Sequence, residues 1–353
     1  MKKNFISGGI LVVFAVVLIV LGGRIKPEIK ETGGFEEEVE LPFKLGVVLP
    51  ADETEGYTKE HMDAIITAAK TAGITEKEIV WKERTEEGDA KGAAEDLVEE
   101  DCTMVIAVCS CHAAEMAEFA EENPQVRTVA VTDTKLFSEN ENFYTAQLDT
   151  KEACYVAGVI AGMKLKEMHE NGKIPKGNYQ ADGRVKIGYV AKYDEERSGT
   201  EYQEFLRGIR SEFSRVIMEI RFTGVRTDLD AEASAADTLV RSGCVMIGTN
   251  TESDRVLSVV GRARENGSRV YAVGYHGNLP EDTSAEYTGI VKDWMQYYSE
   301  LFAAVAAEQE IPAVWEKGYA DGAVTVLQDK KGMTEETKER IEKAAAIWEQ
   351  IQK

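Results

Sequence analysis

The chain has 353 residues, enough for about two domains, and its 43% hydrophobic content can fill two cores. The formal net charge is −22, and so acidic a surface repels phosphate backbones, which argues against a nucleic-acid partner. Five cysteines, an odd number at irregular spacing, are not the pattern of a disulfide framework.

The N-terminus, residues 1–24, reads as an export signal or a membrane anchor. Lys2 and Lys3 precede an almost purely apolar run, Phe5–Leu21, which reaches the lower limit of about 17 residues for a spanning helix. No cleavage site of the A-x-A type is obvious, so an uncleaved anchor is favoured over a cleaved signal of a secreted protein. Either alternative places the globular part outside the cytoplasm. Residues 25–41 form an acidic tether.

A first lobe is expected over residues 42–148. Continuous apolar runs separated by amphipathic stretches are typical of parallel strands covered on both faces by helices. Helices are expected from about Tyr57, Asp89 and Ala113. The strands are expected at Lys44–Leu49, Glu78–Lys82, Met104–Ser110, Arg127–Thr132 and Phe143–Leu148.

A second lobe, over residues 149–286, repeats this pattern. Thr150 is expected to cap its first helix. Its strands are expected at Val185–Ala191, Met218–Gly224, Val245–Asn250 and Arg269–Tyr275. Its further helices are expected at Thr200–Phe213, Leu229–Arg241 and Asp254–Asn266. Because Thr103–Asp133 and Cys244–Tyr275 each read as strand, loop, helix and strand, the sequence predicts two similar α/β lobes.

The last part of the chain is expected to cross between the lobes. We assign residues 287–310 to the first lobe and 311–328 to the second, with a charged C-terminal helix over 329–353. The crossings would form a hinge of several strands.

Polar and aromatic side chains follow the carboxyl ends of the predicted strands, where open parallel sheets bind ligands. Acceptors, donors and aromatic faces together suit a small, flat, hydroxylated molecule. The candidate ligand-binding residues are Asp52, Tyr57, Ser110, His112, Tyr193, Glu196, Asn250, Tyr275, His276, Lys292 and Trp294.

Neither a metal site nor an enzyme is predicted. Cys109, Cys111 and His112 lie close together, but a zinc site needs a second, distant pair of ligands, so the cysteines are interpreted as small buried apolar residues. The sequence contains no G-x-S-x-G, Walker A, H-E-x-x-H or G-x-G-x-x-G motif, and no catalytic residue or cofactor is assigned.

Several blocks resemble the basic membrane protein family of ABC-transporter substrate-binding proteins, which includes purine nucleoside receptors and Med-like proteins. The similar stretches are Phe119–Val126, Tyr155–Met163, Arg221–Gly224, Ala235–Gly248 and Val291–Trp294. The resemblance implies a type I periplasmic-binding-protein fold, an α/β fold of two Rossmann-like lobes. It also implies a ligand of the nucleoside or nucleobase class, with Lys292 as a binding lysine and Asp52 as the acid of the first loop.

The sequence differs from this family in two places. Tyr275 and His276 stand where nucleoside-binding members place aspartates, and no cysteine follows the apolar run to carry a lipid. The leading hypothesis is an extracytoplasmic, membrane-tethered monomer that binds a small polar aromatic ligand between its lobes and delivers it to ABC permease subunits. The alternative is a tethered sensor of the same fold without a transport role.

Overall fold

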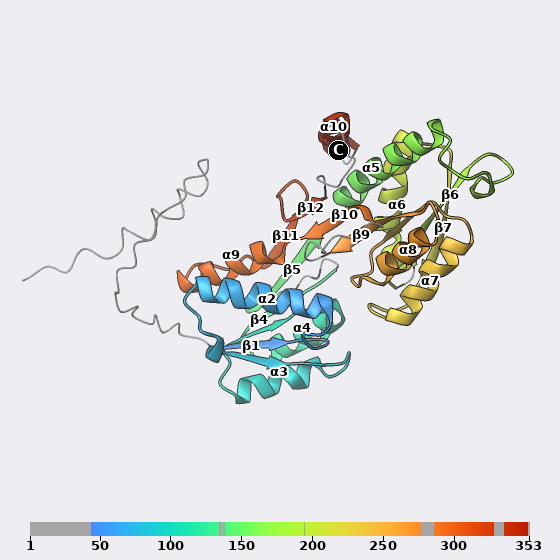
Figure 1. Ribbon diagram of the computed structural model, residues 1–353. Helices are drawn as coiled ribbons and strands as arrows, with labels where there is room; N and C mark the ends of the chain where they lie inside the picture. The colour runs from blue at the N-terminus through green and yellow to red at the C-terminus, as the bar shows by residue number, and fades with distance from the viewer. Residues whose placement is uncertain are drawn as a thin grey trace, which may run out of the picture. The chain divides into compact units, whose positions relative to one another are not determined.

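Two sheets of six strands each organise the chain (Figure 1). The structure, a computed structural model, describes residues 44–133, 136, 138–193, 195–276, 286–327 and 335–351. None of the helices in these ranges is both long and apolar enough to span a bilayer. The expected anchor and tether, residues 1–41, lie outside the described residues.

The first sheet is entirely parallel. Its strands in spatial order are β11 (Val314–Gly318), β5 (Phe143–Asp149), β4 (Arg127–Val131), β3 (Met104–Ala107), β1 (Leu45–Val48) and β2 (Ile79–Lys82). Its helices are α2 (Gly56–Thr71), α3 (Ala90–Glu99), α4 (Ala113–Glu122) and α9 (Trp294–Ala306).

The faces of this sheet follow the alternation of strand side chains. Leu45 and Val47 of β1 pack with α2 and α9, which lie side by side in Figure 1. Val48 points to the opposite face and packs with α3 and α4. Both faces are therefore covered, which explains why the strands read as continuous apolar runs.

The second sheet repeats this order and is parallel except at one edge, where β12 runs antiparallel to β10. Its strands are β12 (Val324–Val326), β10 (Glu286–Lys292), β9 (Tyr271–His276), β8 (Met246–Thr249), β6 (Val185–Ala191) and β7 (Val216–Phe222). One face packs on α5 (Lys151–Glu170) and α6 (Glu195–Glu212), and the other on α7 (Leu229–Arg241) and α8 (Arg255–Glu265).

The order β4-β3-β1-β2 in the first sheet corresponds to β9-β8-β6-β7 in the second. The predicted repeat of two α/β lobes is thus confirmed, and this architecture is the type I periplasmic-binding-protein fold.

The chain crosses between the lobes differently from the expectation. Strand β10 was expected with the first lobe, but it buries both faces and pairs with β9 and β12, so it belongs to the second. The crossing comes one residue later, at Asp293, whose carboxylate caps α9 by accepting a hydrogen bond from Met295 N at 3.0 Å. Strand β11 was expected in the second lobe, yet it pairs with β5 and completes the first sheet.

Glycines let α5 and α6 approach closely. A Cβ at Gly158 would overlap the Phe205 carbonyl oxygen, and a Cβ at Gly208 would overlap the Tyr155 carbonyl oxygen. These helices cover the face of the second sheet on which Tyr189 packs. Neither glycine can therefore carry a side chain without moving the helices apart.

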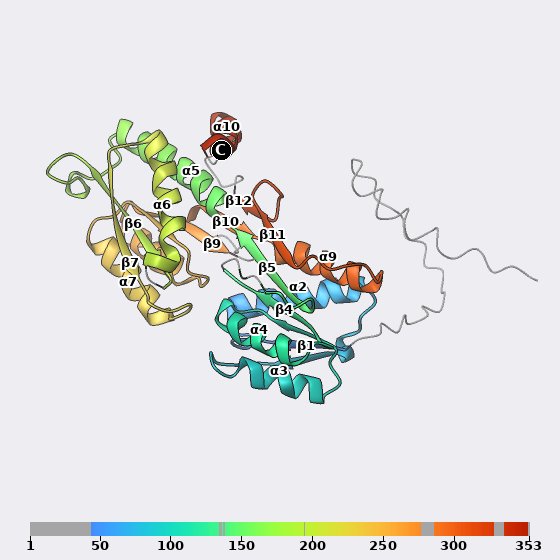
Figure 2. The same cartoon turned by 180° about the vertical axis from the view of Figure 1, so that it is seen from behind.

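The C-terminal helix α10 (Glu335–Ile351) lies beside α5, as Figure 2 shows from behind. The Arg207 guanidinium lies 5.2 Å from the ring centre of Tyr155 and 4.7 Å from that of Trp348. Arg340 Nε donates to Glu212 Oε1 at 2.6 Å. The helix is therefore docked on the second lobe by stacking and by charge.

Candidate functional site

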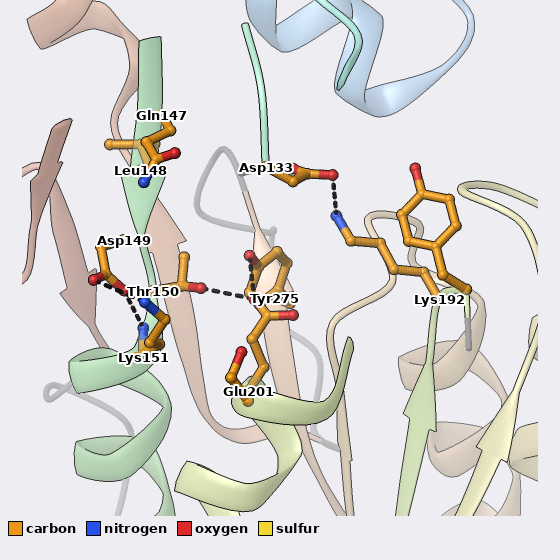
Figure 3. A pocket seen from close by; sticks show the side chains of 11 residues that line it. Asp133, Gln147, Leu148, Asp149, Thr150, Lys151, Lys192, Glu201 and Tyr275 are labelled. Carbon is orange, nitrogen blue, oxygen red and sulfur yellow. Dashed lines mark hydrogen bonds and ion pairs between the residues drawn. The ribbon is translucent and has the colours of Figure 1, made fainter. Parts of the chain in front are cut away.

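A cavity of about 90 Å³ lies where the two lobes meet (Figure 3). The first lobe contributes the end of β5 and the loop after β4, and the second contributes the residues after β6, the first turns of α5 and α6, and β9. The lining residues are Asp133, Gln147, Leu148, Asp149, Thr150, Lys151, Lys192, Tyr193, Thr200, Glu201 and Tyr275.

Glu201, on α6, accepts the hydrogen bonds that connect the residues of one wall of the cavity. Its carboxylate accepts hydrogen bonds from the Thr150 hydroxyl at 2.7 Å, from the Tyr275 hydroxyl at 3.0 Å and from Asn250 Nδ2. Thr150 does precede α5 as expected, but its hydroxyl bonds Glu201 and does not cap the helix. Glu201 thereby fixes the start of α5 against β9.

Asp133 supplies the carboxylate of the opposite wall. It accepts a hydrogen bond from the Ser110 hydroxyl at 2.8 Å within the first lobe. Lys192 Nζ of the second lobe lies 3.8 Å from it, and Figure 3 shows the two side chains pointing toward each other. The half-exposed Asp133 carboxylate is therefore oriented by its own lobe and faces a cation of the other.

Beside this wall, three cations converge on Glu252, which follows β8. The carboxylate lies 2.6 Å from Lys292 Nζ, 3.4 Å from Lys192 Nζ and 3.8 Å from Arg226 Nη1. Burial alone would raise the pKa of Glu252, but the charges of Lys192, Lys292 and Arg226 outweigh it and hold the pKa well below its usual range. Glu252 is thus ionised and serves as the common counter-ion of the cluster.

The tyrosine rings of the site are faced by these cations. Lys292 Nζ lies 4.8 Å from the ring centre of Tyr275 and 5.4 Å from that of Tyr57. The Arg226 guanidinium lies 5.0 Å from the Tyr57 ring, and Lys192 Nζ lies 5.8 Å from the Tyr193 ring. Each is within the range of a cation–π contact.

Behind Tyr57, α2 buries two titratable neighbours. Desolvation raises the pKa of Glu60 to about 8 despite the nearby charge of Lys292, so this carboxyl is mostly protonated at neutral pH. Desolvation also lowers the pKa of His61 to about 3. The neutral His61 ring packs on Trp294 at 4.8 Å and bonds the Tyr298 hydroxyl through Nδ1 at 2.7 Å.

Six of the predicted ligand-binding residues gather around the cavity and the Glu252 cluster. Tyr193 and Tyr275 line the cavity, Ser110 and Asn250 bond its carboxylates, and Tyr57 and Lys292 lie in the cluster. Asn250 also accepts a hydrogen bond from the backbone N–H of Lys192 at 2.9 Å, which fixes the residue that follows β6.

Three others lie elsewhere. Asp52 is held by Arg84 and Thr54, which together lower its pKa to about 2. His112 is fully buried in the first lobe, where its Nε2 lies 3.0 Å from the Thr85 carbonyl oxygen. Trp294 packs in the core of α2 and α9. The side chains of the last two, Glu196 and His276, lie outside the described residues.

The interpretation of all five cysteines as small buried apolar residues is wrong for Cys111, which is only partly buried, and it did not include the bond that the fully buried Cys109 makes. Cys109 and Cys111 form a disulfide that flanks Ser110, because the turn at Ser110–His112 brings the two side chains together. Cys102, Cys154 and Cys244 are free and buried. Within the described ranges, no group of three His, Cys, Asp or Glu side chains is arranged to hold a metal ion.

Most of the charged residues of the site are not among the candidates that strand position selects in the sequence. Asp133 and Lys192 follow strands closely, so the rule that selected the other candidates could have found them. Arg226 lies in the loop between β7 and α7, and Glu201 lies inside a helix, where no positional signal marks them.

Two lobes with a cavity between them, lined by polar groups from both, define the class of two-lobed solute-binding proteins. Residues 47–352 match the Bmp family, described as "ABC transporter substrate-binding protein PnrA-like". Because the match spans most of the chain, the protein belongs to this family of non-catalytic, extracytoplasmic substrate-binding proteins of ABC transporters. None of the curated proteins compared with the chain matches it.

Solved structures share the fold at low sequence identity. A transcriptional activator of the comK gene from Bacillus halodurans is 16% identical, with a TM-score of 0.65 over 86% of this chain and 96% of its own. Solute-binding proteins of ABC transporter systems from Aeropyrum pernix K1 and Conexibacter woesei are both 13% identical. Their TM-scores are 0.68 and 0.63, over 88% of this chain and 86% and 97% of theirs. Identities this low bear on the fold alone.

Proposed function

We propose that the protein binds a small polar aromatic ligand of the nucleoside or nucleobase class in the cavity between its lobes. The observation that carries the proposal is the convergence of carboxylates and hydroxyls from both lobes beside tyrosine rings. Asp133 and Asp149 come from the first lobe, and Thr200 and Glu201 come from the second. Carboxylates accept the hydroxyl donors of a ribose, and Tyr193 and Tyr275 offer aromatic surface for a base.

The cavity of about 90 Å³ is too small for a whole nucleoside, since ligand pockets usually measure about 300–1,000 Å³. Binding therefore requires the lobes to open about the strand crossings and to close again on the ligand. The closed complex would then dock on permease subunits, and the N-terminal segment Phe5–Leu21 would keep it at the membrane.

A thermal-shift screen of the full-length protein against nucleosides, nucleobases, sugars and amino acids tests the ligand class. A ligand at about 100 times its Kd stabilises the folded protein by about 2.7 kcal/mol, which raises Tm visibly. We expect only nucleosides or bases to raise Tm, and Asp133→Asn to weaken their binding.

The matched control is Asp182→Asn, which removes an exposed carboxylate whose partner is Arg184, in the loop before β6. This variant should bind as the wild type does. A melt that shifts with sugars or amino acids, and not with any nucleoside or base, overturns the ligand class.

A further inference from the structure

Arg226, in the second lobe, has hydrogen-bonding capacity that the described part of the chain leaves unused. Arg226 Nη1 is buried and has no hydrogen-bond partner among the described residues. Its closest carboxylate oxygens, on Glu55 and Glu252, lie at 3.7 and 3.8 Å, beyond hydrogen-bond distance. The neighbouring Thr227 hydroxyl is likewise buried without a partner in the described chain.

The carboxylates that face Arg226 and Lys192 from the first lobe each have a hydrogen-bond partner within that lobe. Glu55 Oε2 caps α2 by accepting from the Thr58 N–H at 2.9 Å and the Thr58 hydroxyl at 2.7 Å. Asp133 accepts from Ser110. Neither carboxylate needs the second lobe, so both can release Arg226 and Lys192 when the lobes open.

The charge of the second-lobe cluster does not balance by itself. Lys192, Arg226 and Lys292 carry three positive charges, which the second lobe opposes with only two carboxylates, Glu252 and, for Lys192, Glu201. The side chains of all three cations are 16% exposed or less. Buried charge is costly unless it is paired. When the lobes separate, Arg226 and Lys192 lose the first-lobe carboxylates of Glu55 and Asp133, which leaves a place for an anion beside Arg226.

We propose that Arg226, supported by Lys192, is the specificity-determining residue of a subsite for an oxyanion, so that the ligand carries a carboxylate or a phosphate on its ring or sugar. The inference rests on the proposed function and deepens it. An oxyanion accepts the unused N–H of Arg226, and its charge replaces those of Glu55 and Asp133. Arginine presents its donors in a fixed planar fork that fits both groups.

Calorimetric titration of the full-length protein with matched pairs of probes tests this subsite. Adenosine against adenosine monophosphate isolates the phosphate, and uracil against its 6-carboxylate, orotate, isolates the carboxylate. We expect one charged probe to bind at least about tenfold more tightly than its neutral partner, as one charge-assisted hydrogen bond provides. The pair of probes that shows this preference identifies whether the ligand carries a phosphate or a carboxylate.

Arg226→Gln should abolish the preference for the charged probe. Arg226→Lys keeps the positive charge and should retain part of the preference, which shows that the loss in Arg226→Gln comes from the missing charge and not from misfolding. The matched control is Arg221→Gln, because Arg221 is a half-exposed arginine near the end of β7 that pairs with Glu219; this variant should keep the full preference. A preference that survives in Arg226→Gln overturns the proposal.

The failures of the two proposals are distinguishable. If the neutral probes bind as tightly as the charged ones, the oxyanion subsite is wrong and the nucleoside class stands. If no nucleoside or base binds, but a sugar phosphate or an organic acid does so through Arg226, the ligand class is wrong and the subsite stands. If no anionic probe binds at all, the subsite is wrong as well.

Discussion

Lys292 Nζ lies 2.6 Å from a carboxylate oxygen of Glu252, and both side chains are more than nine-tenths buried. Removing one partner of such a pair leaves a buried charge without compensation, which costs about 3–5 kcal/mol. We expect Glu252→Gln to lower the free energy of unfolding by about this amount in urea titrations, because Lys192 and Arg226 also lose their counter-ion.

A double-mutant cycle separates the pair from its surroundings. Glu252→Gln combined with Lys292→Met should cost less than the two single changes together. Asp182→Asn, at the exposed pair with Arg184, should cost less than about 1 kcal/mol. Strict additivity of the two buried changes would contradict the coupling that we infer from the distance.

The buried carboxyl of Glu60 should make stability depend on pH. Its pKa is about 8 in the folded protein against 4.5 for the ordinary group, so the folded state holds a proton that the unfolded state releases. Its contribution is therefore fully present below pH 4.5 and is lost as the pH rises toward 8. Glu60→Gln removes this loss, and we expect the Tm of the variant to exceed that of the wild type by more at pH 8 than at pH 5. An equal difference at both pH values would contradict the raised pKa.

The contact between α5 and α6 should not tolerate a methyl group. We expect Gly158→Ala to destabilise the protein by roughly 1–3 kcal/mol, because the new Cβ would force the two helix backbones apart. Gly92, in the first turn of α3, has nothing within 4 Å of the position of a Cβ. Gly92→Ala should therefore stabilise the protein through helix propensity, by at most about 0.5–1 kcal/mol, the value for a helix interior. Thermal melts of the two variants should shift in opposite directions.

The cysteines should divide into two classes when they are alkylated. Burial raises the pKa of the Cys102 and Cys244 thiols to about 11 and keeps them protonated and unreactive in the folded protein. Unfolding without a reductant should expose three free thiols to label, and unfolding with a reductant should expose all five cysteines. Mass spectrometry should assign the difference to the peptide with Cys109 and Cys111, and five labels without reductant would contradict the disulfide.

The fold was predictable because its signals are periodic and local. Val185–Ala191 was expected and observed with the same bounds, since its apolar run is continuous and ends at a polar loop. The crossings were not predictable, because nothing in the sequences of β10 and β11 distinguishes one sheet from the other. Only their hydrogen-bonded neighbours, β9 and β5, decide where they belong.

The site was predictable only where position along a strand selects the side chain. Tyr193 was found because it closely follows β6, and Lys292 because it lies at the end of β10. The same rule selected His112 and Trp294, whose side chains turn into the core of the first lobe. Arg226 extends from a loop and contacts Glu252 and Tyr57, which are far from it in the sequence. Residue spacing along the chain does not indicate contacts of this kind.

Strand β11 also sets the order in which the protein can be completed. Five strands of the first sheet are contained in the first 149 residues, but the sixth, residues 314–318, is translated after the second lobe's strands up to β10. Until then β5 has an open edge, and until residue 306 is translated α9 is also missing from the face that it shares with α2. A nascent or truncated chain that ends before residue 318 therefore presents unpaired backbone groups and uncovered apolar surface to chaperones and proteases.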